Sequence, residues 1–102
     1  MVYFKKYETE NGTLLAVCDE ELIGRKLSEG NRQMDLDTYA EFYVGEKLEE
    51  GAVAKALDSV RIYSANVVGK KSVGIFLKKG IVKKENVMEI EGVPYVQIFS
   101  LK

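Results

Sequence analysis

Positive charge is concentrated in one part of the chain, where it could bind an anionic partner. Between Ser59 and Lys84 there are seven basic residues and no acidic residue, although the formal net charge of the chain is only −1. The seven are Arg61, Lys70, Lys71, Lys78, Lys79, Lys83 and Lys84. Clustered lysine and arginine are the usual footprint of a protein that binds nucleic-acid phosphate or an acidic protein. The run therefore predicts a basic binding surface.

An internal explanation of the same charge stays open. Residues 19–58 hold eleven acidic and five basic residues, so this acidic segment could fold beside the basic one. Ion pairs of that kind contribute about 0–1 kcal/mol each when they lie on the surface. We favour a ridge that remains available to a partner, because most of the lysines bunch on one predicted helix.

A second candidate for anion binding is the start of that helix, predicted near Asn66. Gly69-Lys70 matches part of a phosphate-binding P-loop, but the motif also needs an earlier glycine where this chain has Ser64 and a hydroxyl residue where it has Lys71. We therefore exclude a P-loop. Free N–H groups at a helix start bind phosphate or carboxylate, which makes Asn66 and Gly69 contact candidates. The favoured alternative is that Asn66 only caps the helix and Gly69 only permits close packing.

Residues able to catalyse a reaction are scarce. Cys18 precedes a predicted helix start, a position that lowers a thiol pKa, but the acidic residues that follow would raise it and the chain has no histidine to act as a base. We interpret Cys18 as a buried structural residue. Asp35 and Asp37 would share one face of a strand, yet an oxygen-only metal site usually needs more carboxylates. The sequence predicts no catalytic residue, no cofactor and no metal, and favours a binding protein over an enzyme.

An aromatic cluster offers a different surface. Tyr39, Phe42 and Tyr43 lie on a segment too short to bury all three. An exposed aromatic patch often marks contact with a protein partner, including a second copy of the same chain. The alternative, equally favoured, is that these rings cover the core from a loop.

A single domain spanning residues 1–102 must position these groups, because 102 residues leave no room for a second core. Asn11-Gly12 predicts a type I′ hairpin between "VYFKKYE" and "TLLAVC", and the second run is apolar on both faces, as in an interior strand. Asp19 is the predicted cap of a helix that carries Leu22, Ile23 and Leu27 on one side and ends at Gly30.

The remainder alternates between helices and strands. "RQMDLD" is a strand or an extended crossing, "TYAEFY" is one or two helical turns, "EEGAVAKALDSV" is a helix and "RIYSA" is a strand. From Asn66 to Lys79 the period is helical, with Gly80 as the terminator. A hairpin around Glu91-Gly92 follows. We predict an α+β fold: one compact domain with a mixed, mainly antiparallel sheet, hairpins at both ends and about three helices packed on the sheet.

Hydropathy predicts the compartment. No apolar run approaches the length of a membrane span, and "MVYFKKYE" has no signal-peptide core. We expect a cytoplasmic protein with no membrane partner.

Four segments resemble a known family. They are "AVCDEELIGRKLSEG" (16–30), "FYVGE" (42–46), "ANVVGKKSVG" (65–74) and "GVPYVQIF" (92–99). In this order and spacing they resemble domain of unknown function 424, a family of short archaeal proteins. The resemblance covers nearly the whole chain, implies an archaeal cytosolic protein and transfers no catalytic residue.

The resemblance and the charge together favour a non-catalytic protein that contacts structured RNA or a ribonucleoprotein, with a role in translation, through the lysine-rich helix. One alternative is a protein–protein adaptor or homo-oligomer that uses the aromatic cluster. Another is a small-molecule enzyme that binds an anionic ligand at the helix start.

Overall fold

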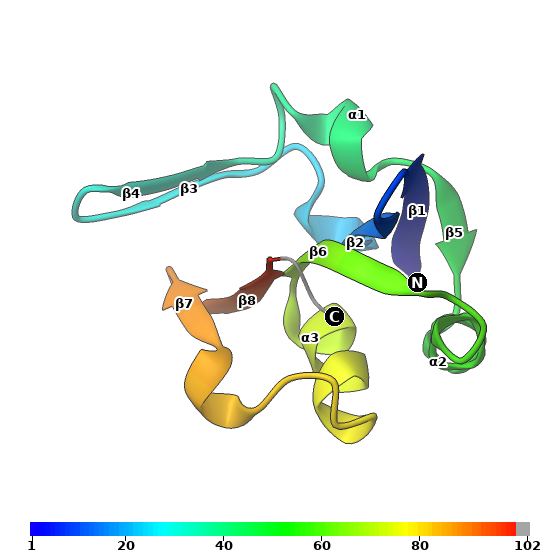
Figure 1. The fold of residues 1–102 in the computed structure, drawn as a ribbon. Coiled ribbons are helices and arrows are strands. Elements are labelled where there is room, and N and C mark those ends of the chain that lie inside the picture. The colour runs from blue at the N-terminus through cyan, green and yellow to red at the C-terminus, as the bar shows by residue number, and fades with distance from the viewer. Residues whose placement is uncertain (100–102) are drawn as a thin grey trace.

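The main sheet has six strands in the order β5-β1-β2-β6-β8-β7 (Figure 1). In the computed structural model, which describes residues 1–99, they are β1 (Val2–Thr9), β2 (Gly12–Asp19), β5 (Glu46–Leu48), β6 (Ile62–Val68), β7 (Met88–Ile90) and β8 (Val93–Ile98). β2 and β6 pair in parallel, and the other neighbouring pairs are antiparallel. The predicted α+β fold, with a mixed and mainly antiparallel sheet and a hairpin at each end, is confirmed.

Helices and a second hairpin cover the two faces of this sheet. α2 (Glu50–Leu57) and α3 (Lys70–Lys78) lie on one face, whereas α1 (Ala40–Tyr43) and the hairpin of β3 (Lys26–Glu29) and β4 (Arg32–Asp35) lie toward the other (Figure 1). Two short 3-10 helices, Glu20–Leu22 and Lys84–Asn86, complete the elements of residues 1–99. The functional candidates therefore lie on opposite sides of the sheet.

The interior position of "TLLAVC" is confirmed by β2. This strand lies between β1 and β6, and its residues from Leu15 onward are buried. Leu15 and Val17 join the core under α2 and α3, while Ala16 and Cys18 join a second core under α1 and the β3–β4 hairpin. Because side chains alternate along a strand, both faces of β2 must be apolar, which explains its unbroken hydrophobic run.

The helix predicted after Asp19 is wrong. Only one 3-10 turn forms, and the chain then bends at Gly24, whose φ of 97° is left-handed, before it enters β3. Leu22 and Leu27 are both buried in the same core, as a helical stripe would require, but Leu27 reaches it from β3. Gly30, with φ of 61°, lies in the β3–β4 turn. The sequence pattern identified the buried side chains but not the backbone that carries them.

The two predicted turns differ in outcome. Glu91 and Gly92 have φ values of 50° and 77°, the pair of positive angles that a type I′ turn requires. Asn11 does not have the positive φ that a type I′ turn requires. Among residues 1–99, Glu91 is the only residue other than glycine with a positive φ. The first hairpin is present, but its loop is Glu10 and Asn11, and Thr9 Oγ1 accepts a hydrogen bond from the Asn11 N–H at 3.2 Å.

None of the helices within residues 1–99 has both the length and the apolar character needed to cross a membrane.

Candidate functional site

Asn66 does not lie at a helix start. It belongs to β6, which continues to Val68, and α3 begins only at Lys70. Ala65 and Val67 face the core that α3 covers, so strand alternation turns Asn66 to the opposite face of the sheet. There its Oδ1 accepts a hydrogen bond from Gln97 Nε2 at 3.2 Å. The predicted helix start at Asn66 is wrong, and Asn66 cannot act on one anion together with the lysines of α3.

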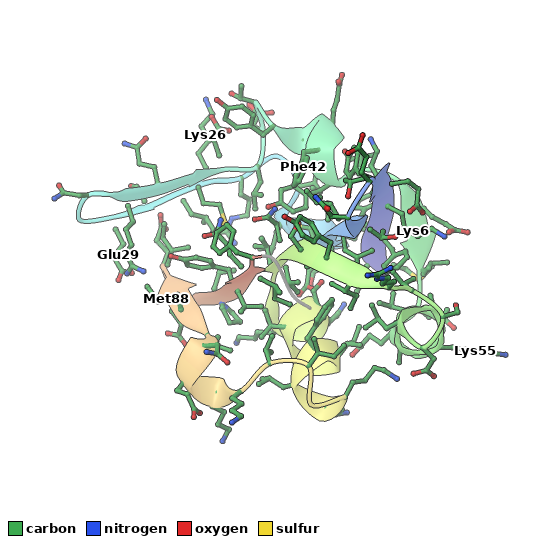
Figure 2. All side chains as sticks on the ribbon, in the orientation of Figure 1. Lys6, Lys26, Glu29, Phe42, Lys55 and Met88 are labelled. Carbon is green, nitrogen blue, oxygen red and sulfur yellow. The ribbon has the colours of Figure 1, made fainter. Side chains whose placement is uncertain are left out.

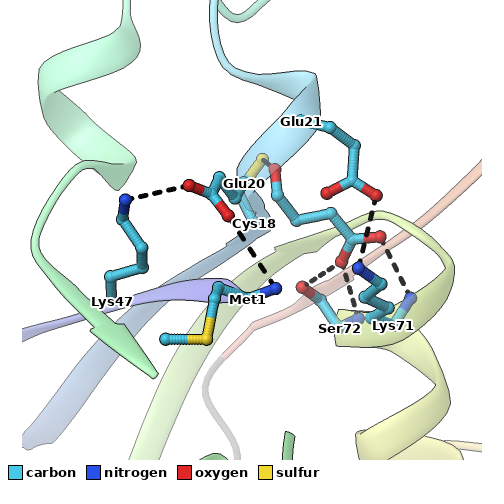
Figure 3. A network of polar contacts seen from close by, with 8 residues as sticks. Met1, Cys18, Glu20, Glu21, Lys47, Lys71 and Ser72 are labelled. Carbon is cyan, nitrogen blue, oxygen red and sulfur yellow. Dashed lines mark hydrogen bonds and ion pairs between the residues drawn. The ribbon is translucent and has the colours of Figure 1, made fainter. Parts of the chain in front are cut away.

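The start of α3 is capped by Asp19, at the end of β2. One carboxylate oxygen, Oδ1, accepts hydrogen bonds from the Ser72 N–H at 2.8 Å and from the Ser72 hydroxyl at 2.7 Å, and Oδ2 accepts one from the Lys71 N–H at 3.1 Å (Figure 3). Asp19 is 3% exposed. A negative group at a helix N-terminus is stabilised by the helix dipole. The anion site predicted here is thus already filled by a carboxylate of the same chain.

Gly69 allows that carboxylate to approach. Its φ is 111°, a left-handed conformation that favours glycine, and an added Cβ would overlap the Asp19 carboxyl group. The interpretation that Gly69 permits close packing is confirmed, with Asp19 as the neighbour. The sequence predicts Asp19 as the cap of a helix formed by the residues that directly follow it, and not as the cap of α3. Asp19 is the only charged residue that is buried among residues 1–99, but burial is not visible in the sequence.

Beside Asp19, two glutamates hold basic groups. Glu20 receives the Lys47 ammonium at 2.9 Å and lies 3.8 Å from the N-terminal amine of Met1 (Figure 3). The hydrogen bond from Lys47 lowers the pKa of Glu20 and raises the pKa of Lys47. Glu21 lies 3.6 Å from the Lys71 ammonium. The acidic segment after β2 therefore neutralises one lysine of α3.

Lys70 and Lys78 lie on the outer side of α3, because the helix packs on the sheet through Val73, Ile75 and Phe76. Lys83 and Lys84 follow the helix and are exposed as well. Lys79 pairs with Asp58 at the end of α2. Within the basic run, four lysines have no carboxylate oxygen within 4.0 Å among residues 1–99. We call these four exposed residues the lysine face: Lys70, Lys78, Lys83 and Lys84. Arg61, at the start of the same basic run, is also exposed and has no such ion pair in that part of the chain.

Two hollows flank α3 on this side. The first, of about 350 Å³, lies between α2 and α3, and its lysines are Lys70, Lys78 and Lys79. The second, of about 400 Å³, lies between α3 and the segment that leads into β8, and its lysines are Lys70 and Lys84. Lys70 and Gly74 line both hollows. The surface is therefore indented as well as basic.

Cys18 is fully buried, which confirms its structural interpretation. Its Sγ contacts the backbone oxygen of Asp19 at 3.4 Å. Burial, with a smaller contribution from the nearby acidic side chains Asp19 and Glu21, raises the pKa of the Cys18 thiol to about 12. A thiol in this state is not a nucleophile near neutral pH.

Comparison with known proteins identifies the family. The sequence model of a family described as "Protein of unknown function (DUF424)" matches residues 7–101. The chain belongs to this family. That confirms the resemblance seen in the four sequence segments. No curated protein shows a significant match.

A solved structure has the same fold as this DUF424 protein. It is described as the crystal structure of an uncharacterized conserved protein from Methanopyrus kandleri. The similarity covers 99% of this chain and 94% of that chain, with a TM-score of 0.79 and 24% sequence identity. At this identity the match supports the architecture and does not transfer a function.

The three predicted partner-contact aromatics of this DUF424 protein differ in exposure. Tyr43 is buried, which raises the pKa of its hydroxyl to about 12. Phe42, on α1 (Figure 2), is half-buried and stacks on Tyr7, with ring centroids 5.3 Å apart. Tyr39 is 65% exposed. Thus two rings cover the core from α1, and Tyr39 is left at the surface, on the rim of a hollow of about 310 Å³ that Asn66 also lines.

Of the acidic pair Asp35 and Asp37, Asp35 forms hydrogen bonds with backbone N–H groups. Asp35 Oδ1 accepts hydrogen bonds from the Asp37 N–H at 3.0 Å and the Thr38 N–H at 2.8 Å. These bonds, with that to Thr38 the largest contribution, lower the pKa of Asp35. Among residues 1–99, no three potential ligands are grouped so that they could hold a metal ion.

Proposed function

We propose that this DUF424 protein is a non-catalytic RNA-binding protein whose lysine face contacts phosphates. The observation that carries the proposal is the set of four exposed lysines of the basic run that have no carboxylate within 4.0 Å in residues 1–99, three of which, Lys70, Lys78 and Lys84, line two hollows beside α3. A lysine ammonium is a mobile point charge that contacts phosphate without reading bases. In this proposal the partner is RNA, free or within a ribonucleoprotein, and the lysine contacts give the binding little sequence preference. A cytoplasmic location and a role in translation are parts of the same proposal.

The internal explanation of the charge accounts for only part of the basic run. Of the acidic residues in the segment 19–58, Glu21 pairs with Lys71 of α3 and Asp58 with Lys79, the residue after α3. Glu50 lines the α2–α3 hollow but pairs with no lysine among residues 1–99. Most of the positive charge of the basic run is thus unpaired within residues 1–99 and lies at the surface, where it attracts a polyanion.

Binding is favoured over catalysis for reasons of geometry. The thiol of Cys18 is buried and protonated, the chain has no histidine, and the N–H groups of Lys71 and Ser72 already donate to Asp19. A nucleophile, a base and an anion-stabilising group do not meet at one place within residues 1–99.

The test is the salt dependence of RNA binding. For single-stranded RNA, the slope of log affinity against log salt is about −0.7 for each phosphate contact, because counterions are released. The double variant Lys70→Gln/Lys78→Gln should make the slope shallower by about 1.4.

A matched control has the same change in net charge. Lys26→Gln/Lys55→Gln alters two exposed lysines, on β3 and α2 (Figure 2), that line neither of the two hollows. It should leave the slope nearly unchanged. The proposal fails if RNA does not bind at low salt, or if both double variants weaken binding equally.

The exposed ring of Tyr39 favours a second candidate function. Tyr39 and Val44 flank α1 and are 65% and 40% exposed, respectively. Exposed aromatic and apolar side chains on one short helical segment suit a protein partner or a second copy of this chain. Sedimentation of the wild type and Tyr39→Ser tests this candidate: a dimer that dissociates in the variant supports it. If the wild type is a monomer at all concentrations, the proposal that Tyr39 mediates a homo-oligomer is wrong.

A further inference from the structure

We propose that a single phosphodiester strand crosses α3 at Gly74, passing between Lys70 and Lys78. The inference rests on the proposed function and adds the path and the strandedness of the RNA. The inference starts from Gly74, which has no side chain, and from the lysines and hollows that lie on either side of it.

Neither backbone conformation nor internal packing explains the glycine at position 74. Its φ is not positive, and an added Cβ would meet no atom within 4 Å. Gly69 differs in both respects, since its φ is left-handed and its Cβ would strike Asp19. Glycine inside a helix is less stable than alanine, because more backbone freedom is lost on folding. For the fold alone, alanine would be the better residue at 74.

What Gly74 does provide is a gap in a row of lysines. Positions 70, 74 and 78 are spaced by four residues, so they follow one another along one side of the helix. With a rise of 1.5 Å per residue, Lys70 and Lys78 are separated by about 12 Å along the axis, with Gly74 halfway between them. A phosphate above Gly74 can therefore approach the helix backbone with one ammonium on each side.

The two hollows extend this gap into a path. Both are lined by Lys70 and Gly74, so they meet at the point where the strand would cross. Lys78 lines the hollow on the α2 side, and Lys84 lines the hollow on the β8 side. Each hollow also contains one carboxylate, from Glu50 or Glu89, whereas the residues shared by both are a lysine and a glycine. The most favourable position for a phosphate is thus the crossing itself.

The shape of the path selects a single strand. To occupy both hollows, the backbone must bend over a helix about 10 Å wide. A double helix is stiff over many times that length, whereas a single strand bends freely. Contacts on both sides of α3 are therefore available to single-stranded RNA and not to a duplex.

The experiment fills the gap without harming the fold. Gly74→Gln places a neutral side chain over the crossing, and Gln is a better helix former than Gly, so the melting temperature should stay the same or rise. The probe is a short single-stranded oligouridine, and affinity is measured over a range of salt. Gly74→Gln should weaken binding by about tenfold and make the salt slope shallower by about 0.7, one phosphate contact.

Two controls separate the possible failures. Ala52→Gln adds similar bulk to an exposed position of α2 that lines neither hollow, and it should bind oligouridine like the wild type. Gly74→Ala adds a single methyl group into open space and should lose less affinity than Gly74→Gln. A duplex of the same length should bind the wild type more weakly than oligouridine does.

The outcomes distinguish this inference from the proposed function. If Gly74→Gln binds like the wild type while Lys70→Gln/Lys78→Gln does not, the crossing is wrong and RNA binding stands. If the duplex binds more tightly than oligouridine, the single-strand assignment is wrong. If the wild type binds neither RNA, both proposals are overturned.

Discussion

Asp19 and Ser72 are joined by two hydrogen bonds, of 2.8 Å and 2.7 Å, although they lie 53 residues apart in the sequence. The register of the central strands explains the contact. β2 and β6 run in parallel with Cys18 beside Val68, so the end of β2 lies next to the point where the chain turns into α3. One residue beyond that pair, the carboxylate of Asp19 meets the start of the helix. The contact fastens α3, and with it Lys70 and Lys78 of the lysine face, to the centre of the sheet.

Replacing Asp19 should destabilise the fold strongly. Asp19→Ala removes the acceptor of three hydrogen bonds and leaves two backbone N–H groups and one hydroxyl without their partner. Loss of a helix cap and of buried hydrogen bonds to a charged group should lower the free energy of unfolding by about 3 kcal/mol, measured in urea. Ser72→Ala removes only the hydroxyl contact and should cost about 1 kcal/mol.

Glu21→Ala is the matched control for Asp19→Ala. Glu21 is an exposed carboxylate on the same segment and forms a surface ion pair with Lys71 at 3.6 Å. Its removal should change the free energy of unfolding by less than about 0.5 kcal/mol. Equal effects of the two variants would show that the cap contributes little to stability.

Gly69→Ala should be destabilising for two separable reasons. The φ of 111° is strained for alanine, and the new Cβ collides with the Asp19 carboxyl group. In the double variant Asp19→Ala/Gly69→Ala the collision is absent, so the loss should be smaller than the sum of the two single losses by about 1 kcal/mol or more. Additive losses in urea unfolding would contradict the close packing of Gly69 against Asp19.

The sequence was sufficient where structure depends on local pattern. Continuous apolar residues predicted β2 as an interior strand, and Glu91-Gly92 predicted the last hairpin. Prediction from the sequence was wrong where the structure depends on contacts between segments that are distant in the chain. Asp19 obeys the capping rule, but it caps a helix brought to it by the β2–β6 register and not the segment that follows. The helical pattern predicts a start at Asn66 because "VVG" is apolar enough for either a strand or a helix, whereas the segment belongs to β6 up to Val68.

The candidate site was predicted in part for the same reason. Clustering of lysines on one helix is a local property, so the outward direction of Lys70 and Lys78 could be expected from the buried stripe of α3. Which lysines meet a carboxylate depends on the positions of other elements. Lys79 is paired because α2 ends beside α3 and brings Asp58 to it. The hollows around Gly74 depend on that same arrangement, and nothing in the local sequence marks them.

Stability should fall as the pH rises above about 9, because of Cys18. The pKa of its thiol is about 12 in the folded protein, against 9.0 for an ordinary cysteine, so the unfolded chain ionises first. The folded state then binds more protons than the unfolded state, and the free energy of unfolding decreases by up to about 1.4 kcal/mol per pH unit between these values.

Cys18→Ala isolates this effect. Tyr43 has a raised pKa as well, about 12 against 10.0, and adds to the slope only from about pH 10 upward. Between pH 9 and 10 the variant should therefore show a flatter dependence than the wild type when both are unfolded in urea. An identical slope in the two proteins would mean that the Cys18 thiol is accessible to solvent. A thiol reagent provides an independent check, since its reaction with native wild type should be limited by unfolding.

The β3–β4 hairpin should loosen when Glu29 is replaced. Glu29 accepts a hydrogen bond from the Glu91 N–H at 2.8 Å, and Glu91 in turn accepts one from the Ser28 N–H at 2.6 Å. This reciprocal pair joins the hairpin to the β7–β8 turn, and the same Glu29 side chain forms an ion pair with Arg32 at 3.0 Å. Because these groups are exposed, Glu29→Ala should lower the free energy of unfolding by only about 1 kcal/mol.

The larger effect should be local, because opening the hairpin does not require the main sheet to unfold. Amide hydrogen exchange in β3 and β4 and at Glu91 should accelerate in Glu29→Ala, whereas amides of β2 and β6 should change only by the small global difference. Glu10→Ala is the control, since Glu10 is an exposed acid in the loop of the β1–β2 hairpin and its side chain has no ion pair or hydrogen bond among residues 1–99. It should leave exchange in β3 and β4 unchanged. Exchange that rises equally in all strands of Glu29→Ala would mean that the hairpin and the sheet unfold as one unit, and that the Glu29–Glu91 contact is part of global stability.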